Sequence, residues 1–203
     1  MKIIAIGRNY AAHAKELNNP IPGKPVIFLK PDTALLKDNK PFYIPDFSNN
    51  IHFELEVVLK ISKEGKHIAE KFASKYYQEI GLGIDFTARD IQTEHKEKGL
   101  PWELAKAFDN SAAVSSFVPK EGFSDLRNLD FELKINDQIR QQGNTSLMLF
   151  SCDYIIHFIS KYITLKKGDL IFTGTPEGVG QVHTCDRLQG NLAGRELLNF
   201  EIK

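Results

Sequence analysis

The segment from residue 51 to residue 61 alternates between apolar and mostly polar side chains, and this pattern constrains the fold more than any other feature. The odd positions are all apolar, and the even positions carry His52, Glu54, Glu56, Val58 and Lys60. Strict alternation predicts a β-strand with one face in the core and one polar face. Glu54 and Glu56 would then project side by side from the polar face.

Two carboxylates held this close repel each other, so their arrangement is unfavourable unless water, a cation or a basic group neutralises the charge. A divalent metal ion would do so, and carboxylate oxygens suit magnesium, manganese or calcium. The alternative is the solvated face of an ordinary amphipathic strand. Taken alone, the segment favours that alternative.

The composition bounds the class of protein. A length of 203 residues fits a single domain, 1–203, with a sizeable core. Lys plus Arg and Asp plus Glu both total 26, and this balance argues against nucleic acid or a membrane surface as partner. The two cysteines show no motif spacing, which favours a reducing compartment. Since no membrane span or signal peptide is recognisable, we expect a cytoplasmic protein.

Short β-like runs outnumber helical patterns along the chain. The expected strands cover 2–6, 26–30, 53–61, 80–86, 129–136 and 169–173. Helical patterns cover 10–17, 69–77, 87–98 and 151–162. Because strands and helices do not alternate regularly, we expect a β-rich α+β fold rather than a doubly wound parallel sheet. The loop 18–23 follows the first helix, and a mobile flap there is a hypothesis.

Asp85 closes an apolar run in which two glycines would allow a close approach of backbone or ligand. A carboxylate at this strand–helix junction could reach a site formed by another strand, or it could simply cap the helix or end the strand. The following residues, 87–90, have the form of a helix capping box. Arg89 and Gln92 share one helix face and could hold a substrate carboxylate, although such a polar helix is usually exposed.

A histidine and a lysine elsewhere in the chain are also candidate site residues. His13 and Glu16 are three residues apart on a short helix, where the carboxylate would orient the imidazole and leave its other nitrogen to take a proton from water. An ordinary surface pair, worth about 0.2–0.5 kcal/mol, is the alternative. Lys106 is a lone cation in an apolar setting. It either offsets anionic charge in a pocket or extends its ammonium to solvent.

The Gly-rich segment 173–180 follows an expected strand. It lacks the Gly-Lys-Ser/Thr ending of a phosphate-binding loop, and no Gly-x-Gly-x-x-Gly occurs, so nucleotide binding has no support. Such a turn can still lend backbone N–H groups or the hydroxyl of Thr175 to a ligand. The chain also lacks the His-Glu-x-x-His, Cys-x-x-Cys and Gly-x-Ser-x-Gly motifs, which weakens a zinc enzyme or a serine hydrolase.

In their order and spacing, these segments resemble the fumarylacetoacetate hydrolase (FAH) family, specifically its compact acylpyruvase type. The matching stretches are 7–10 (Gly-Arg-Asn-Tyr) with His13 and Glu16, 28–31 (Phe-Leu-Lys-Pro), 52–56 (His-Phe-Glu-Leu-Glu), 85–90 (Asp-Phe-Thr-Ala-Arg-Asp), 99–102 (Gly-Leu-Pro-Trp) with Lys106, and 173–180 (Thr-Gly-Thr-Pro-Glu-Gly-Val-Gly). The resemblance spans nearly the whole chain. Because only six residues precede Gly7, we expect no counterpart of the extra N-terminal domain of FAH proper, which would favour a smaller substrate.

The resemblance implies a β-roll of mixed sheets, usually a homodimer, with Mg2+ or Mn2+ held by three carboxylates. In that family a His–Glu pair activates water. The pair lies on a lid that becomes ordered when ligand binds. The matching residues are Glu54, Glu56 and Asp85 for the metal, His13, Glu16 and Lys106 for catalysis or charge balance, and Arg89, Gln92 and Thr175 for substrate binding. His52 has no assigned role, and we expect it to support the ligands rather than bind the metal.

The implied function is metal-dependent hydrolysis of 2,4-dioxo acids to pyruvate and a carboxylic acid, with decarboxylation of oxaloacetate in the same site. The metal would act as a Lewis acid for the negative charge that develops on the substrate. One alternative is an isomerase or decarboxylase of 2-hydroxyhepta-2,4-diene-1,7-dioate-type intermediates of aromatic catabolism. A non-catalytic, metal-dependent protein that binds oxo acids is another, and the His13–Glu16 pair disfavours it.

Overall fold

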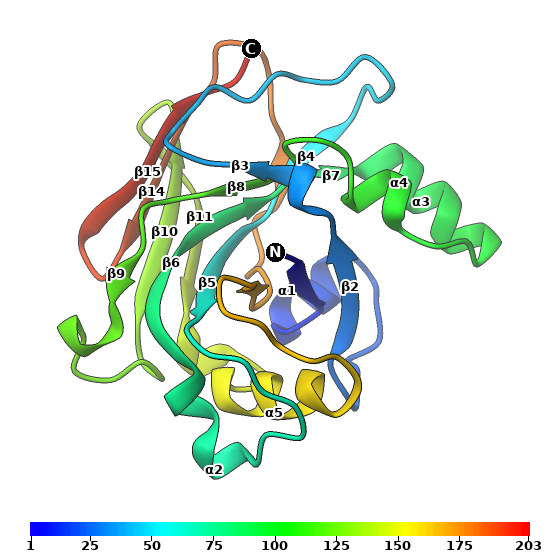
Figure 1. The fold of residues 1–203 in the computed structure, drawn as a ribbon. Helices are drawn as coiled ribbons and strands as arrows, with labels where there is room; N and C mark the ends of the chain where they lie inside the picture. Colours follow the sequence, from blue (N-terminus) through cyan, green and yellow to red (C-terminus); the bar gives the residue numbers. More distant parts are fainter.

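The computed structural model describes residues 1–203, and strands dominate it (Figure 1). The strands are β1 (Ile3–Gly7), β2 (Val26–Lys30), β3 (Leu35–Leu36), β4 (Ile51–Phe53), β5 (Leu55–Ile61), β6 (Tyr77–Asp85), β7 (Thr87–Ala88), β8 (Ala112–Val114), β9 (Val118–Pro119), β10 (Asp130–Ile135), β11 (Gln138–Asn144), β12 (Leu170–Phe172), β13 (Gly180–Gln181), β14 (Arg187–Leu192) and β15 (Arg195–Glu201). The helices are α1 (Ala11–Glu16), α2 (Glu70–Ala73), α3 (Arg89–Lys98), α4 (Glu103–Lys106) and α5 (Cys152–Tyr162). No helix is both long and apolar enough to cross a membrane.

The largest sheet has eight strands and curls around one side of the molecule (Figure 1). Its order is β2-β1-β12-β5-β6-β8-β3, and β9 pairs with β6. The pairs β1–β12 and β3–β8 are parallel, whereas the remaining pairs are antiparallel. The prediction of a β-rich α+β fold with mixed sheets is therefore confirmed.

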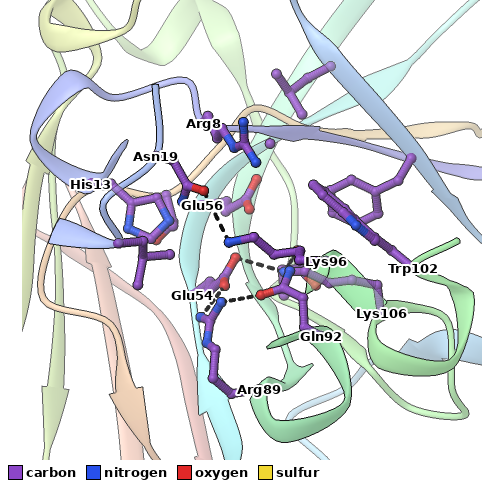
Figure 2. Close-up of a pocket in the computed structure, with 16 residues that line it drawn as sticks. Arg8, His13, Asn19, Glu54, Glu56, Arg89, Gln92, Lys96, Trp102 and Lys106 are labelled. Carbon is purple, nitrogen blue, oxygen red and sulfur yellow. Dashed lines mark hydrogen bonds and ion pairs between the residues drawn. The ribbon is translucent and has the colours of Figure 1, made fainter. Parts of the chain in front are cut away.

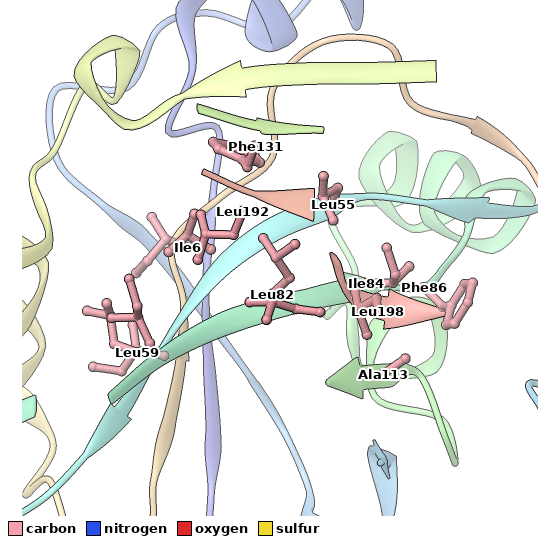
Figure 3. Close-up of a cluster of buried hydrophobic side chains, with 14 of the residues drawn as sticks. Ile6, Leu55, Leu59, Leu82, Ile84, Phe86, Ala113, Phe131, Leu192 and Leu198 are labelled. Atoms are coloured by element: carbon pink, nitrogen blue, oxygen red, sulfur yellow. The ribbon is translucent and has the colours of Figure 1, made fainter. Parts of the chain in front are cut away.

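A four-stranded antiparallel sheet, β11-β10-β14-β15, packs against the large sheet, and β13-β4-β7 form a third, small sheet. The main core lies between the two larger sheets, where Leu55, Leu82, Phe131 and Leu198 meet (Figure 3). Each of these side chains is almost fully buried, and such burial stabilises a fold by about 1.5–3 kcal/mol per side chain. This packing holds β5 and β6 rigidly beside each other.

The even-numbered face of β5 differs from the sequence prediction. The odd positions of β5 pack into the main core as the alternation predicts, but Glu56 and Val58 on the other face are also buried. The predicted strand is interrupted at Glu54, because β4 pairs with β7 and β13 whereas β5 pairs with β6 and β12. A solvated polar face is therefore the wrong interpretation, since both carboxylates lie inside the protein.

The run that ends at Asp85 is a central strand, β6, as predicted. A Cβ atom added at Gly83 would lie 2.5 Å from the ring of Phe172, so the close approach there is to a side chain of β12. The predicted capping box is wrong. Residues 87–88 form β7, and α3 begins only at Arg89, where the N-cap residue Ala88 makes no side-chain cap bond. The hydroxyl of Thr87 instead donates to the carbonyl of Asp85, at 3.3 Å.

Candidate active site

Sixteen residues line a pocket between the start of α1, the carboxyl end of β6 and the helix α3 (Figure 2). They include eight of the nine residues that the sequence analysis singled out, namely His13, Glu54, Glu56, Asp85, Arg89, Gln92, Lys106 and Thr175. The ninth, Glu16, contacts the His13 imidazole. The fold thus brings together side chains from five separate segments of the chain, and their individual roles remain predictions.

Three buried carboxylates form the floor of this pocket. Glu54 occupies the break between β4 and β5, Glu56 follows in β5, and Asp85 is the last residue of the neighbouring strand β6. The amide of Asp85 donates to the carbonyl of Glu54 at 2.9 Å, which fixes the two chain segments relative to each other. One oxygen from each carboxylate lies within 4.8 Å of the others. This spacing allows all three to contact a single ion.

The carboxylates differ in how their charge is compensated. Burial acts to raise the pKa of Glu54, but the charges of Lys106 and Arg89 outweigh it and hold that pKa well below its usual range. Burial raises the pKa of Glu56 well above its usual range, and the charges of Asp85 and Glu54 add to this effect. Glu56 has no ion-pair partner, and its side chain accepts only the Gly174 N–H, at 2.5 Å. A hard divalent cation would supply the missing positive charge, so an all-carboxylate donor set fits Mg2+ or Mn2+.

Two lysines lie behind the carboxylates. The Lys106 ammonium donates to Glu54 Oε2 at 2.9 Å, Asp85 Oδ2 at 2.8 Å and Thr87 Oγ1 at 2.5 Å. Burial acts to lower the pKa of Lys106, but the charges of Asp85 and Glu54 raise it above its usual value. Lys106 therefore balances anionic charge, and its ammonium is not solvated.

The second lysine, Lys30, was missed as a site residue. Its ammonium lies 2.7 Å from Asp85 Oδ1 and donates to the carbonyl of Ser111 at 3.0 Å. Burial lowers the pKa of Lys30, and the charge of Asp85 opposes that effect. The signal in the sequence was a single cation at the end of the apolar run 26–30, since a buried lysine requires a carboxylate partner.

Arg89 and Gln92 occupy one face of α3, as their spacing predicts. The Arg89 guanidinium donates through Nη2 to Glu54 Oε1 at 2.6 Å and through Nη1 to Gln92 Oε1 at 2.5 Å (Figure 2). Gln92 is buried, although the polar composition of the helix predicted exposure. Both terminal nitrogens of Arg89 thus contact protein groups, and the guanidinium orients Glu54.

His13 and Glu16 face each other on α1, with His13 Nδ1 3.1 Å from Glu16 Oε2. The other oxygen of Glu16 accepts the N–H of Gly178 at 3.0 Å, which joins α1 to the Gly-rich turn. The His13 side chain is only 6% exposed, so this is no ordinary surface pair. When Nδ1–H donates to Glu16, Nε2 is the nitrogen left with a free lone pair.

Thr175 is held in the pocket by a buried glutamine that the sequence analysis missed. Gln141, in β11, donates to Thr175 Oγ1 at 2.9 Å and to the carbonyl of Pro176 at 3.0 Å. Its side-chain oxygen accepts the N–H of Leu55 at 2.9 Å. Gln141 lies in a strand of mostly exposed polar residues, and nothing in that pattern distinguishes it from its neighbours.

His52 does not belong to the carboxylate cluster. Its Nε2 pairs with Asn50 Oδ1 at 2.8 Å. Burial lowers the pKa of His52 to about 4, and the charge of Arg89 adds to this effect. The His52 side chain bonds to Asn50 rather than to any of the three carboxylates, and the supporting role expected for it stays a prediction.

The loop 18–23 after α1 contributes one residue to the pocket. Asn19 lines the pocket, and its side-chain oxygen accepts from Lys96 Nζ at 3.0 Å (Figure 2). This bond links the loop 18–23 to α3. Mobility of the loop stays a prediction.

The fold and the site together define a β-rich protein with a buried carboxylate centre that could hold a divalent cation. The model of the family "Fumarylacetoacetate (FAA) hydrolase C-terminal" matches residues 2–202. The chain therefore belongs to the fumarylacetoacetate hydrolase family, as its sequence motifs predicted.

Relatives and solved structures extend this result. "Oxaloacetate tautomerase FAHD1, mitochondrial" from Bos taurus is 45% identical over 201 residues, which covers 99% of this chain and 91% of the bovine protein. "Oxaloacetate decarboxylase, mitochondrial" from Dictyostelium discoideum is 42% identical over 203 residues, or 99% of this chain and 93% of that protein. The crystal structure of fumarylpyruvate hydrolase from Pseudomonas aeruginosa in complex with Mn2+ and pyruvate superposes with a TM-score of 0.94. It is 33% identical and covers 100% of this chain and 89% of that one.

Proposed function

We propose that the protein is a divalent-metal-dependent enzyme that cleaves a carbon–carbon bond in small 2-oxo acids. Its reactions are hydrolysis of acylpyruvates and decarboxylation of oxaloacetate. The observation that carries the proposal is the meeting of two groups in one pocket: three buried carboxylates, of which Glu56 has no cationic partner, and a His–Glu pair aimed at the same space. A protein that only binds oxo acids has no need of the second group.

Glu54, Glu56 and Asp85 would hold the metal ion. When bound, the ion supplies a Lewis acid that stabilises negative charge on the oxygens of the oxo acid. Lys106 and Lys30 pair with Asp85, and Arg89 pairs with Glu54, so two of the three donors are held in place by cations. Thr175, held by Gln141, offers its hydroxyl to the substrate from the Gly-rich turn.

His13 and Glu16 provide the proton transfer that hydrolysis requires. With Nδ1–H of His13 donating a hydrogen bond to Glu16, Nε2 of His13 takes a proton from water as the water oxygen attacks the distal carbonyl carbon. The bond between that carbon and the neighbouring methylene then breaks, and its electron pair passes to the pyruvate fragment, which is protonated to give pyruvate. Decarboxylation of oxaloacetate releases CO2 and needs no attacking water, so it depends much less on His13.

A second candidate function is keto–enol tautomerisation of oxaloacetate, the reaction in the name of the bovine relative. His13 favours it, since an imidazole that lines the pocket can move a proton at the carbon between the two carbonyl groups. The isomerisation of hydroxy-dienedioates stays an alternative on the same reasoning. We also propose that the protein is located in the cytoplasm. Both relatives named above are called mitochondrial.

The test is a side-by-side assay of acetylpyruvate, oxaloacetate and a hydroxy-dienedioate, with metal-stripped protein and with Mg2+ or Mn2+ added back. We expect Asp85→Ala to abolish turnover of both oxo acids. His13→Ala should lower hydrolysis by about 100-fold or more, the usual contribution of a general base, and should lower decarboxylation much less. His183→Ala, which changes an exposed histidine, is the matched control. Equal losses of both activities in His13→Ala would refute the role given to His13, and full activity without metal would refute the proposal as a whole.

A further inference from the structure

Four cationic side chains line the pocket, and they fall into two pairs. Lys106 and Arg89 both contact carboxylates on the pocket floor. Arg8 and Lys96 have no carboxylate partner at all, although both extend into the same pocket (Figure 2). The second pair is therefore available to a ligand, whereas the first pair already serves the metal centre.

Arg8 is placed by a strained and well-anchored backbone. Its φ angle of 61° lies in the left-handed region, which residues other than glycine rarely adopt and which is retained mainly where the surroundings enforce it. The next residue, Asn9, is fully buried and donates to the carbonyls of Phe150 at 3.0 Å and Thr173 at 2.7 Å. The half-buried Arg8 side chain makes no hydrogen bond or ion pair, so the anchored backbone holds a guanidinium in the pocket that has no partner in the protein.

Lys96 approaches the same space from α3. Its ammonium donates only to Asn19 Oδ1, at 3.0 Å, which leaves two N–H donors free. Partial burial lowers the pKa of Lys96, and the charges of Arg8 and Arg89 lower it further. Arg8 and Lys96 thus repel each other across the pocket, and an anion between them would relieve that repulsion.

The net charge of the whole pocket also favours binding of an anionic group. Four cations and three carboxylates line it, which leaves one excess positive charge when His13 is not counted. A divalent cation on the floor would raise the excess to three. A monoanionic acylpyruvate compensates one of these charges, whereas a dicarboxylic oxo acid compensates two and places its second carboxylate away from the metal.

We propose that Arg8 and Lys96 form a subsite for the distal carboxylate of a four-carbon dicarboxylic 2-oxo acid, so that such acids are preferred over acylpyruvates with an uncharged tail. This inference rests on the proposed function for the metal centre, because the first carboxylate and the 2-oxo group are taken to bind there. Asn19 adds a neutral hydrogen-bonding group to the subsite and closes it from the loop after α1. Phe28 and Trp102, whose rings meet edge-on at 5.8 Å, form the apolar wall on which an uncharged tail would pack instead.

The first test measures binding without turnover. Malate and 2-hydroxybutyrate both have four carbons and a 2-hydroxy acid group, and they differ in the distal carboxylate. Calorimetric titration of the Mn2+-loaded protein should show tighter binding of malate. We expect Arg8→Gln and Lys96→Gln each to weaken the binding of malate by about tenfold to a hundredfold relative to the binding of 2-hydroxybutyrate. This is the range for a lost hydrogen bond between charged groups. Equal affinities of the wild-type protein for the two ligands would overturn the proposal.

The second test compares substrates in the same variants. The ratio of KM for oxaloacetate to KM for acetylpyruvate should rise by a similar factor in Arg8→Gln and Lys96→Gln, and KM is the quantity compared because the distal carboxylate is itself the group lost as CO2. Lys98→Gln, on the exposed side of the same helix and paired with Glu94 at 2.6 Å, is the matched control and should leave the ratio unchanged. An equal rise in KM for both substrates would mean that the two cations act through the general electrostatics of the pocket, and the subsite would be refuted.

The two tests separate the subsite from the proposed function. If the wild-type protein prefers malate through Arg8 and Lys96 but turns over neither oxo acid, the subsite stands and the proposed function fails. If both substrates are turned over and the variants bind malate as well as the wild type does, the function stands and the subsite fails. Thermal unfolding of each variant checks that the fold is retained.

Discussion

Replacement of Lys106 by methionine tests how the protein keeps three carboxylates in its interior. The Lys106 ammonium contacts both Glu54 and Asp85 and is only 3% exposed. Removal of one partner from a buried ion pair typically costs about 3–5 kcal/mol, because the remaining charge is left uncompensated. For a chain of 203 residues each kcal/mol lowers Tm by about 2–4 °C, so Lys106→Met should lower the Tm of the metal-free protein by roughly 6–20 °C.

The loss should depend on metal and on pH. Excess Mg2+ should restore more of the Tm in Lys106→Met than it adds to the wild type, since the ion compensates the same carboxylates. Lys106 helps to hold the pKa of Glu54 below its usual 4.5. A lowered carboxylate pKa contributes stability that is present above about pH 4.5 and is lost as the pH falls further, so the difference between the two proteins should shrink in acid.

Scanning calorimetry at pH 7.5 and pH 4, with EDTA and then with Mg2+, provides the measurement. Lys98→Met changes a lysine whose side chain is 61% exposed and should alter Tm by less than about 2 °C. A decrease in Tm for Lys106→Met no larger than this control, in EDTA at pH 7.5, would refute the reasoning. It would mean that water or protonation already compensates the cluster.

Three further predictions concern residues around the site. His52→Gln should make the free energy of unfolding fall less steeply as the pH falls from 6.5 to about 4. The lowered pKa of His52 makes the unfolded state bind more protons than the folded state in that window. An unchanged pH profile of urea unfolding would contradict this. Gln141→Leu should cost about 1–3 kcal/mol and raise KM through Thr175, which chemical denaturation and steady-state kinetics would measure; a stable variant with an unchanged KM would contradict it. We also propose the homodimer that the family resemblance implies, with exposed Leu104 in its interface; light scattering should show a dimer that Leu104→Glu weakens, and a monomeric wild type would contradict it.

Much of the site could be predicted because its residues lie in short local patterns. Glu54 and Glu56 stand two apart on a strand, and His13 and Glu16 stand three apart on a helix, so local geometry alone brings each pair together. Family motifs in the right order then connected the pairs with Asp85. The same local geometry could not show that both faces of β5 are buried, since that depends on the packing of the whole large sheet.

The residues that were missed act over long distances in the sequence. Lys30 reaches Asp85 only because β2 and β6 lie in one curled sheet, and Gln141 reaches Thr175 only because the second sheet packs on the first. The strands β14 and β15 were missed as well, although Leu188 and Leu192 are fully buried, because glycine, asparagine and charged residues interrupt their apolar alternation. Strand pairing stabilises these segments where their local pattern is weak.

Titration of the metal-stripped protein with Mn2+, followed by the loss of the free-ion electron paramagnetic resonance signal, tests the central claim most directly. We predict that the wild type binds one ion per chain, that oxo-acid turnover returns in proportion to the bound ion, and that Glu56→Gln binds it far more weakly. Glu79→Gln changes a partly exposed carboxylate of β6 that is paired with Lys60, and it should bind the ion as the wild type does. Absence of a stoichiometric site in the wild type, or equal binding by Glu56→Gln, would contradict the account.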